Sequence, residues 1–241
     1  MPELTFGQAQ VVYEVVHSRR ATIGIEVRPD RQVVVRVPYS VDDEHITSIV
    51  RQKTPWILRQ LARVQLASVH HIEKEFVSGE SFSYLGKNYR LKIIGNGVDA
   101  STSVAFHSGR LWVITNRMHD IQDIRMGIRN AIVAWYQKRA RDVLTRHVEV
   151  LSRKTGIKPF RVNVKSQLHR WGSCTKNRVL NLNWRIIMAP TSIIDYVITH
   201  ELCHLKIHNH STDFWQFLGA ILPDYKKRRE WLRNNGQLLD F

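Results

Sequence analysis

The sequence predicts an α+β fold, with a β-rich N-terminal region that contains one helical segment and a mainly helical C-terminal region. Three observations support this class. Short runs of β-branched and aromatic residues recur before residue 118, a long amphipathic pattern begins near Asp120, and shorter helical patterns follow residue 190. We therefore expect two domains, residues 1–118 and 119–241, a reasonable number for a chain of 241 residues.

The strands of the N-terminal region are expected in two groups. In the first group, Pro29-Asp30 marks a turn, and in the second group Gly86-Lys87-Asn88 and Ser108-Gly109 mark hairpin turns. Runs of Val, Ile, Tyr and Phe between such turns are typical of strands. The predicted strands are residues 11–16, 22–27, 33–37, 82–85, 89–94, 104–107 and 111–115.

A helix is expected between the two groups of strands. The acidic pair Asp43-Glu44 lies where a helix N-terminus favours negative charge, and this helix is expected to run to about Lys53. Thr54-Pro55 then resembles the N-cap and the first position of a new helix. Proline lacks the N–H that a helix interior requires, but the first helical position does not need this donor. We expect the helix to restart or kink there and to continue to about Glu75.

The C-terminal region is expected to begin with a long helix. Apolar residues recur at intervals of three and four between Asp120 and Lys154, and Gly156 is placed to end the helix. Residues 160–164 and 179–184 are predicted to be strands. The remaining apolar patterns predict helices at about residues 193–207, 214–221 and 225–234.

The chain is strongly basic. It has 36 Lys and Arg against 21 Asp and Glu, a formal net charge of +15. The stretch from Val150 to Ile194 contains nine of these cations and no acid. Such a segment is either a solvated surface whose acids lie elsewhere in the fold or a site for a polyanion. We expect DNA as a partner of this basic surface.

The composition does not indicate a membrane protein or a secreted protein. The sequence has no run of 18 apolar residues, and its start at Met1–Leu4 lacks the features of a signal peptide. Cys174 and Cys203 are too few for a disulfide framework and fit a reducing compartment. We therefore expect no membrane partner and a cytoplasmic location.

One pentapeptide, His200-Glu201-Leu202-Cys203-His204, indicates chemistry. Residues four apart in a helix lie one turn apart on the same face, so His200 and His204 can direct their imidazoles at one metal ion. Glu201 lies beside them and can act as a base on a water molecule. The apolar run 193–198 before the motif indicates a buried helix, in which two imidazoles need a partner such as a metal ion.

A hydrolytic zinc site requires a third protein ligand and an open position for water. His208 lies about 12 Å along the helix from His200, which is too far to share an ion. His210 is favoured if the helix ends and the chain turns back at Asn209, a residue type that tolerates left-handed backbone. Ser211 is then placed to cap the next helix.

Other residues are candidates for further roles at this site. Glu230 is the alternative third ligand, although the cations around it favour a helical salt bridge. Tyr196, one turn before His200, and Arg185 are candidates for stabilising negative charge on a substrate, against the simpler roles of core packing and surface charge. Residues 179–184 are a candidate edge strand along which a peptide substrate pairs.

Several motifs together resemble the YgjP-like metallopeptidases, relatives of the SprT-like group. These motifs are Ser78-Gly79-Glu80, Arg170-Trp171-Gly172-Ser173-Cys174, Leu182-Asn183-Trp184-Arg185, the pentapeptide His200–His204, Asn209-His210-Ser211, Phe214-Trp215 and Pro223-Asp224-Tyr225. The resemblance implies a zincin-like metallopeptidase core over residues 119–241, with a long helix, a small antiparallel sheet, an active-site helix and C-terminal helices. It also implies Zn²⁺ as cofactor, with His200, His204 and His210 as its ligands and Glu201 as the catalytic base.

The function expected from the sequence is zinc-dependent hydrolysis of peptide bonds, in which Glu201 takes a proton from a zinc-bound water and passes it to the leaving amine. A protein or peptide is the expected substrate, and the basic surface suggests DNA-associated proteins. Two alternatives are a metal-dependent nucleotide phosphohydrolase and a basic nucleic-acid-binding protein with a zinc site. The first would be expected to show a Gly-rich phosphate loop, and the second would not need Glu201.

Overall fold

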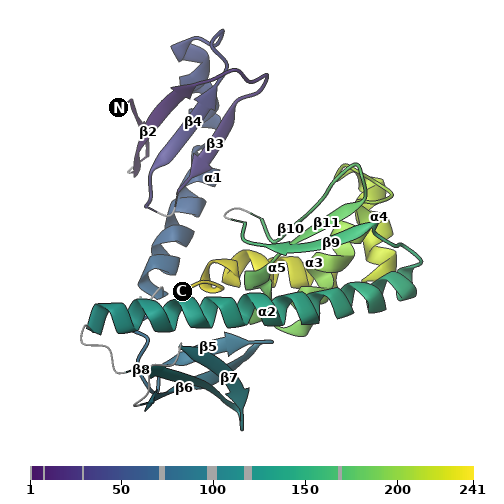
Figure 1. Ribbon diagram of the computed structural model, residues 1–241. Coiled ribbons are helices and arrows are strands. Elements are labelled where there is room, and N and C mark those ends of the chain that lie inside the picture. Colours follow the sequence, from purple (N-terminus) through teal and green to yellow (C-terminus); the bar gives the residue numbers. More distant parts are fainter. Residues whose placement is uncertain are drawn as a thin grey trace. The chain divides into compact units, whose positions relative to one another are not determined.

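The computed structural model describes residues 2–7, 9–28, 30–70, 74–96, 102–116, 121–167 and 170–241. It is a mixed α+β structure, as the sequence predicts (Figure 1). The chain divides into two compact units, residues 1–72 and 73–241. This division differs from the expected boundary between residues 118 and 119, because the strands before that boundary share one core with the helices after it.

The first unit is a four-stranded sheet packed against one helix. Its strands lie in the order β1 (Glu3–Phe6), β2 (Ala9–His17), β4 (Val33–Val37) and β3 (Gly24–Val27), and β2 and β4 run parallel. Helix α1 (Asp43–His70) contributes the other half of the core. Tyr13 and Val35 of the sheet are buried together with Ile46, Val50 and Ile57 of the helix.

Helix α1 is a single helix that contains Pro55. The sequence predicted a restart or a kink at this position; the helix does not restart, and burial anchors the segment on both sides of the proline. Thr54 and Ile57 on either side are fully buried, and Thr54 Oγ1 donates a hydrogen bond to the carbonyl of Val50 at 2.9 Å. Glu75 lies outside any helix, so the expected end of the helix was too late.

The second unit begins with another four-stranded sheet. The strands lie in the order β5 (Ser81–Tyr84), β6 (Lys87–Asn96), β8 (Arg110–Asn116) and β7 (Ser103–His107), with β6 and β8 parallel. Helix α2 (Ile121–Thr155) runs along one face of this sheet (Figure 1). Leu91 and Val113 of the sheet and Ile132 of the helix are buried in their common core.

A second, smaller sheet lies in the same unit, in the order β10 (Gly172–Cys174), β11 (Val179–Asn183) and β9 (Arg161–Lys165). The sequence implied an antiparallel sheet, but this one is mixed. Strand β11 pairs antiparallel with β10 and parallel with β9. The chain reverses its direction once between β9 and β10 and again between β10 and β11, so β9 and β11 run the same way. Leu180 and Leu182 of β11 are completely buried.

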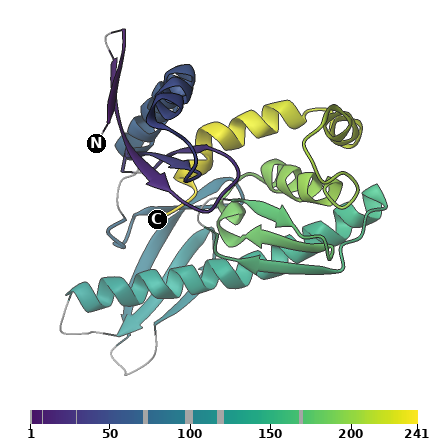
Figure 2. The same cartoon turned by 90° about the horizontal axis from the view of Figure 1, so that it is seen from above.

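Four short helical segments and one buried helix complete the chain. They are the 3-10 helix η1 (Trp184–Met188), α3 (Thr191–Cys203), α4 (Thr212–Ile221), α5 (Tyr225–Asn235) and the 3-10 helix η2 (Gly236–Leu238). Helix α3 contacts α2, β10, α4 and α5, so it lies at the centre of this part of the fold (Figure 2). None of the helices in the described ranges combines the length and the apolar character needed to cross a lipid bilayer.

Candidate metal centre

The three histidines named from the sequence come from two adjoining segments. His200 lies in the last turn of α3, and His204 is the C-cap residue of this helix. Helix α3 therefore ends at Cys203, four residues earlier than predicted. Its apolar side chains hold it in the core, since Ile194, Val197 and Leu202 are all buried.

The chain returns to the site between α3 and α4, and this turn brings in His210. The backbone N–H groups of Leu205 and Lys206 donate to the carbonyls of Leu202 and Cys203, each at 3.0 Å, which forms tight turns directly after the helix. Asn209 does not adopt the left-handed backbone expected for it. Ser211 does cap α4 as expected, because its Oγ accepts the N–H of Phe214 at 3.4 Å.

The structure places the three imidazoles around one point. His210 Nε2 lies 3.1 Å from His200 Nε2 and 3.2 Å from His204 Nε2. Three nitrogen ligands of a tetrahedral zinc ion, each bound at about 2.0–2.1 Å, would be separated by about 3.3 Å. The three nitrogens therefore fit a shared metal ion, and no other group of His, Cys, Asp and Glu in the described residues offers a comparable set.

The environment favours the neutral imidazoles that metal ligation requires. Burial, together with smaller effects of the neighbouring His204, His210 and Arg229, lowers the pKa of His200 to about 3. Burial also lowers the pKa of His210, with smaller effects from His204 and Arg229. His204 Nδ1 lies 3.0 Å from the carbonyl of Ile207, so a proton on Nδ1 leaves the Nε2 lone pair free for the centre.

Glu201 lies next to this cluster and is 7% exposed. Burial raises the pKa of its carboxyl group to about 7, and the positive charge of Arg170 opposes this shift. The carboxylate packs against β10, where Gly172 provides the space: a Cβ atom at Gly172 would lie 2.7 Å from Glu201 Cγ. Within the described residues no hydrogen bond is made to this carboxylate, so it is available to a water molecule or a substrate.

The strand order corrects one expectation about the substrate edge. Residues 179–184 were the candidate edge strand, but β11 (Val179–Asn183) is the central strand of its sheet. The edge strand beside Glu201 is β10, which pairs with β11 on one side only among the strands that the structure describes. The sequence predicted a strand at 179–184, and the structure has one at Val179–Asn183, but an apolar pattern does not distinguish central strands from edge strands.

Two aromatic side chains of α4 pack against the histidines, and sequence reasoning gave them no role. Phe214 stacks on His204 with ring centroids 4.5 Å apart, and Trp215 stacks on His210 at 5.4 Å. Arg229 of α5 also lies over the ring of Trp215, with its guanidinium carbon 4.5 Å from the ring centroid. The only sequence signal for this packing was the pair Phe214-Trp215 shortly after His210.

The two candidates for stabilising negative charge differ in position. The ring of Tyr196 lies 5.9 Å from that of His200, and its hydroxyl makes no hydrogen bond to any described residue. Burial raises the pKa of Tyr196 to about 12, so the hydroxyl keeps its proton and can donate it in a hydrogen bond. Arg185 is already engaged, because its Nε lies 2.7 Å from Asp240 Oδ1 and its Nη1 donates to Ser166.

The remaining sequence candidates lie outside the cluster. Glu230 pairs with Arg233 at 3.0 Å, as expected for a helical salt bridge. His208 is exposed and does not join the three histidines.

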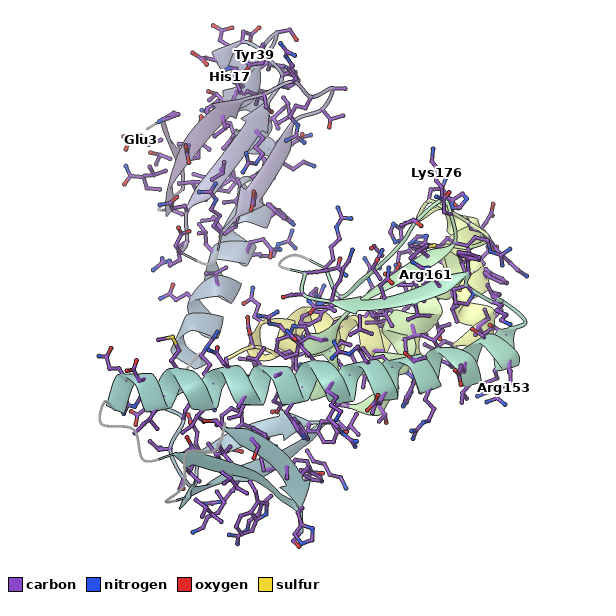
Figure 3. All side chains as sticks on the ribbon, in the orientation of Figure 1. Glu3, His17, Tyr39, Arg153, Arg161 and Lys176 are labelled. Carbon is purple, nitrogen blue, oxygen red and sulfur yellow. The ribbon has the colours of Figure 1, made fainter. Side chains whose placement is uncertain are left out.

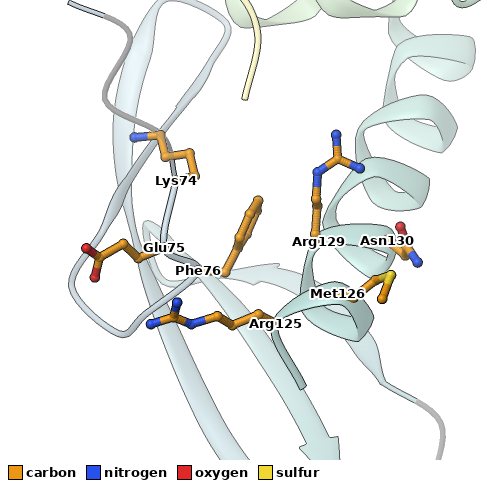
Figure 4. Close-up of a pocket in the computed structure, with 7 residues that line it drawn as sticks. All are labelled: Lys74, Glu75, Phe76, Arg125, Met126, Arg129 and Asn130. Carbon is orange, nitrogen blue, oxygen red and sulfur yellow. The ribbon is translucent and has the colours of Figure 1, made fainter. Parts of the chain in front are cut away.

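A pocket of about 520 Å³ lies away from the histidines, between the segment before β5 and the start of α2 (Figure 4). Its lining includes Phe76, Arg125 and Arg129 but none of the three histidines.

Comparison with known proteins bears on the whole chain. A family model described as "YgjP-like, metallopeptidase domain" matches residues 21–235. No curated protein matches the sequence. Among solved structures, the chain is similar to the crystal structure of the metallopeptidase zymogen of Pyrococcus abyssi abylysin, with 20% sequence identity and a TM-score of 0.35 over 39% of this chain and 94% of that chain. The assignment to a family rests on the family model, which spans both compact units.

Proposed function

This chain belongs to the YgjP-like metallopeptidases, and from this premise we propose that it is a zinc peptidase in which His200, His204 and His210 hold the ion and Glu201 is the catalytic base. Membership of the family makes the protein a metallopeptidase. The observation that supports the finer assignment is the triangle of Nε2 atoms, with the carboxylate of the adjacent Glu201 beside it. We also propose that the surrounding fold is a zincin-like core.

The choice of zinc follows from the chemistry of the ligands. Three neutral imidazole nitrogens suit Zn²⁺, whereas Mg²⁺ and Ca²⁺ prefer oxygen ligands. Three protein ligands leave the fourth tetrahedral position open, which is typical of a hydrolytic site. When bound, the ion supplies Lewis-acid chemistry, which makes water a better nucleophile and polarises a peptide carbonyl.

The protein's own residues supply the proton transfers and the orientation. Glu201 takes a proton from the attacking water as the new C–O bond forms, and then passes this proton to the nitrogen of the leaving amine as the peptide C–N bond breaks. The hydroxyl of Tyr196 donates a hydrogen bond to the negative charge that develops on the carbonyl oxygen. Burial of Glu201 against Gly172 keeps its carboxylate in one place.

Strand β10 is the proposed binding edge for the substrate. Its residues Gly172–Cys174 pair with β11 on one side, so the other side can accept the main chain of an extended peptide. Because Gly172 lies directly against Glu201, a peptide on this edge would have its main chain near the base. Main-chain pairing selects extended, unfolded segments rather than a particular sequence.

A nucleic-acid-associated protein is the proposed class of substrate. The supporting observation is the formal net charge of +15, together with the acid-free stretch from Val150 to Ile194. A basic enzyme is drawn to proteins that are bound to a polyanion. We propose that the protein acts in the cytoplasm, since its two cysteines are both free.

Cleavage of an unfolded protein tests the proposed activity. The wild-type protein and a Glu201→Gln variant, both with measured metal content, are incubated with a reduced, unfolded protein, and the products are identified by mass spectrometry. We expect new peptide termini with the zinc-loaded wild type and none with the variant. Cleavage by the variant at the wild-type rate would remove Glu201 from the mechanism. Nucleoside triphosphates serve as the negative control, and their hydrolysis would favour the phosphohydrolase.

A further inference from the structure

The sheet of β5–β8 has two faces of different character. One face packs on α2 through Leu91, Leu111 and Val113, which are buried. Because successive side chains of a strand point to opposite faces, the residues between them lie on the other face. We call this the cationic sheet face, formed by Arg90 and Lys92 of β6, Arg110 and Trp112 of β8, and His107 of β7. Trp112 is half-buried, and the other four side chains are exposed.

The strand register places like charges beside one another on this face. Arg90 of β6 is the partner of Arg110 of β8, and Arg110 is the partner of His107 of β7. Lys92 lies in the next row, beside Trp112. Like charges at paired positions of a sheet repel each other, and an anion bound between Arg90 and Arg110 would relieve this repulsion.

Among the residues that the structure describes, no acidic side chain pairs with these cations. The described part of the sheet, residues 81–96 and 102–116, contains no Asp or Glu. Arg90, Lys92 and Arg110 form no ion pair and donate no hydrogen bond to any described residue. All three side chains are exposed, so a negatively charged partner would complement this surface.

Trp112 adds an apolar element to the same surface. Its Nε1 donates a hydrogen bond to the carbonyl of His107 at 3.0 Å, which fixes the indole across β7 and β8. No other aromatic ring of the described residues stacks on it. A half-exposed indole between cations is the combination that binds single-stranded nucleic acid, because bases stack on the ring while the cations contact phosphates.

The cations of the acid-free stretch 150–194 are arranged differently. Arg178 donates to the carbonyl of Lys158 at 2.7 Å, and Arg185 is paired with Asp240. Figure 3 shows Arg153 on α2, Arg161 on β9 and Lys176 in the turn between β10 and β11. The cationic sheet face is a separate surface with a defined register, and its aromatic ring distinguishes it from a general basic surface.

We propose that the cationic sheet face binds single-stranded nucleic acid, with Trp112 stacked on a base and Arg90, Lys92 and Arg110 against the phosphates. The choice of nucleic acid as the partner rests on the proposed cleavage of nucleic-acid-associated proteins. Nucleic acid bound to this face would bring such proteins to the enzyme. Binding is measured without cleavage, so the two proposals can fail independently. DNA and RNA share the chemistry recognised here, and the experiment compares them.

Fluorescence anisotropy of a labelled oligothymidylate, an oligouridylate and a DNA duplex tests the proposal on the full-length, zinc-loaded protein. We expect tighter binding of the single strands than of the duplex. Arg90→Ser with Arg110→Ser should reduce the slope of log affinity against log salt by about 1.4, because two phosphate contacts are lost. Trp112→Leu should weaken binding by about tenfold, which is the effect of one stacked base.

The matched control removes two cations from elsewhere, Arg153→Ser with Lys176→Ser. This control should bind almost as tightly as the wild type. Lys92→Glu is a second test at a single exposed position and should weaken binding even if the double variant folds poorly. Mass spectrometry of the ultraviolet-cross-linked complex should locate the adduct on a peptide of β6 or β8.

Three outcomes would overturn the proposal. The first is wild-type affinity in the Arg90/Arg110 variant together with loss of binding in the control variant, which would move the site to the acid-free stretch. The second is preference for the duplex. The third is that the variants weaken the binding of polyglutamate as much as they weaken the binding of the oligonucleotides. The face would then recognise negative charge on any polymer, an acidic protein included.

Discussion

The carboxylate of Glu201 occupies the space that a side chain at Gly172 would need. A Cβ atom at Gly172 would lie 2.7 Å from Glu201 Cγ and 2.8 Å from Glu201 Oε1. We therefore expect Gly172→Ala to displace the carboxylate and to reduce kcat/KM by about 100-fold, since a misplacement of about 1 Å at a reacting group has an effect of this size. Metal content should not change, and it is measured on the same samples.

Gly127→Ala is the matched control for this substitution. Gly127 lies in α2, and the nearest atom to an added Cβ is Thr102 Oγ1 at 3.7 Å, an ordinary contact. Full activity is expected, and the free energy of unfolding should rise by up to about 1 kcal/mol, because alanine is the better helix former. Full activity in Gly172→Ala as well would mean that the position of Glu201 is not critical for catalysis.

Tyr196→Phe tests the hydrogen bond to the developing negative charge. The change removes only the hydroxyl group of a buried ring near His200, so the packing should persist. We expect kcat to fall by about 100-fold with little change in KM. Arg185→Gln provides the contrast, because it breaks the ion pair with Asp240 and should lower stability without reducing kcat. An unchanged kcat in Tyr196→Phe would assign the ring to packing alone.

Ser211 links the stability of α4 to the position of His210. Its side chain accepts the N–H of Phe214, and removing an N-cap costs about 1 kcal/mol. Ser211→Ala should therefore lower the free energy of unfolding by about this amount and weaken zinc binding, as measured by chemical denaturation and by competition with a chelator. Ser211→Asp can form the same cap and should restore both properties. Equal zinc affinity in all three proteins would show that the cap does not position His210.

Glu80 holds an unfavourable backbone conformation at Phe76. Phe76 has φ 57°, in the left-handed region that bulky residues avoid, and its N–H donates to Glu80 Oε2 at 2.7 Å. The N–H of Glu75 donates to the other carboxylate oxygen at 3.2 Å. Glu80→Ala should lower the free energy of unfolding by about 1–3 kcal/mol, because both donors lose their partner. Glu75→Ala changes only an exposed side chain and should have little effect in the same urea titration.

Local patterns in the sequence predicted much of the fold. The helices at α4 and α5 and the strand at β11 lie where apolar periodicity placed them. The spacing of His200 and His204 also placed both rings on one face of a helix, because this relation depends only on helix geometry. Ser211 was predicted as a cap from its residue type and its position before an apolar run.

The features that depend on tertiary structure could not be predicted in this way. Strand order made β10 rather than β11 the edge strand, and no periodic pattern records which strands are neighbours. Burial of Thr54 and Ile57 kept α1 continuous at Pro55 against the local preference of proline. The stack of Arg229 on Trp215 joins two helices, so neither residue showed a signal within its own segment.

Zinc binding by histidine variants tests the central proposal most directly. The wild-type protein should bind one zinc ion per chain, and X-ray absorption should show nitrogen ligands at about 2.0–2.1 Å. His210→Ala should lose most of the zinc after dialysis, whereas His208→Ala and Glu230→Gln should keep it, because neither side chain belongs to the cluster. Wild-type zinc content in His210→Ala, or loss of zinc in Glu230→Gln, would contradict the assignment of His200, His204 and His210 as the ligands.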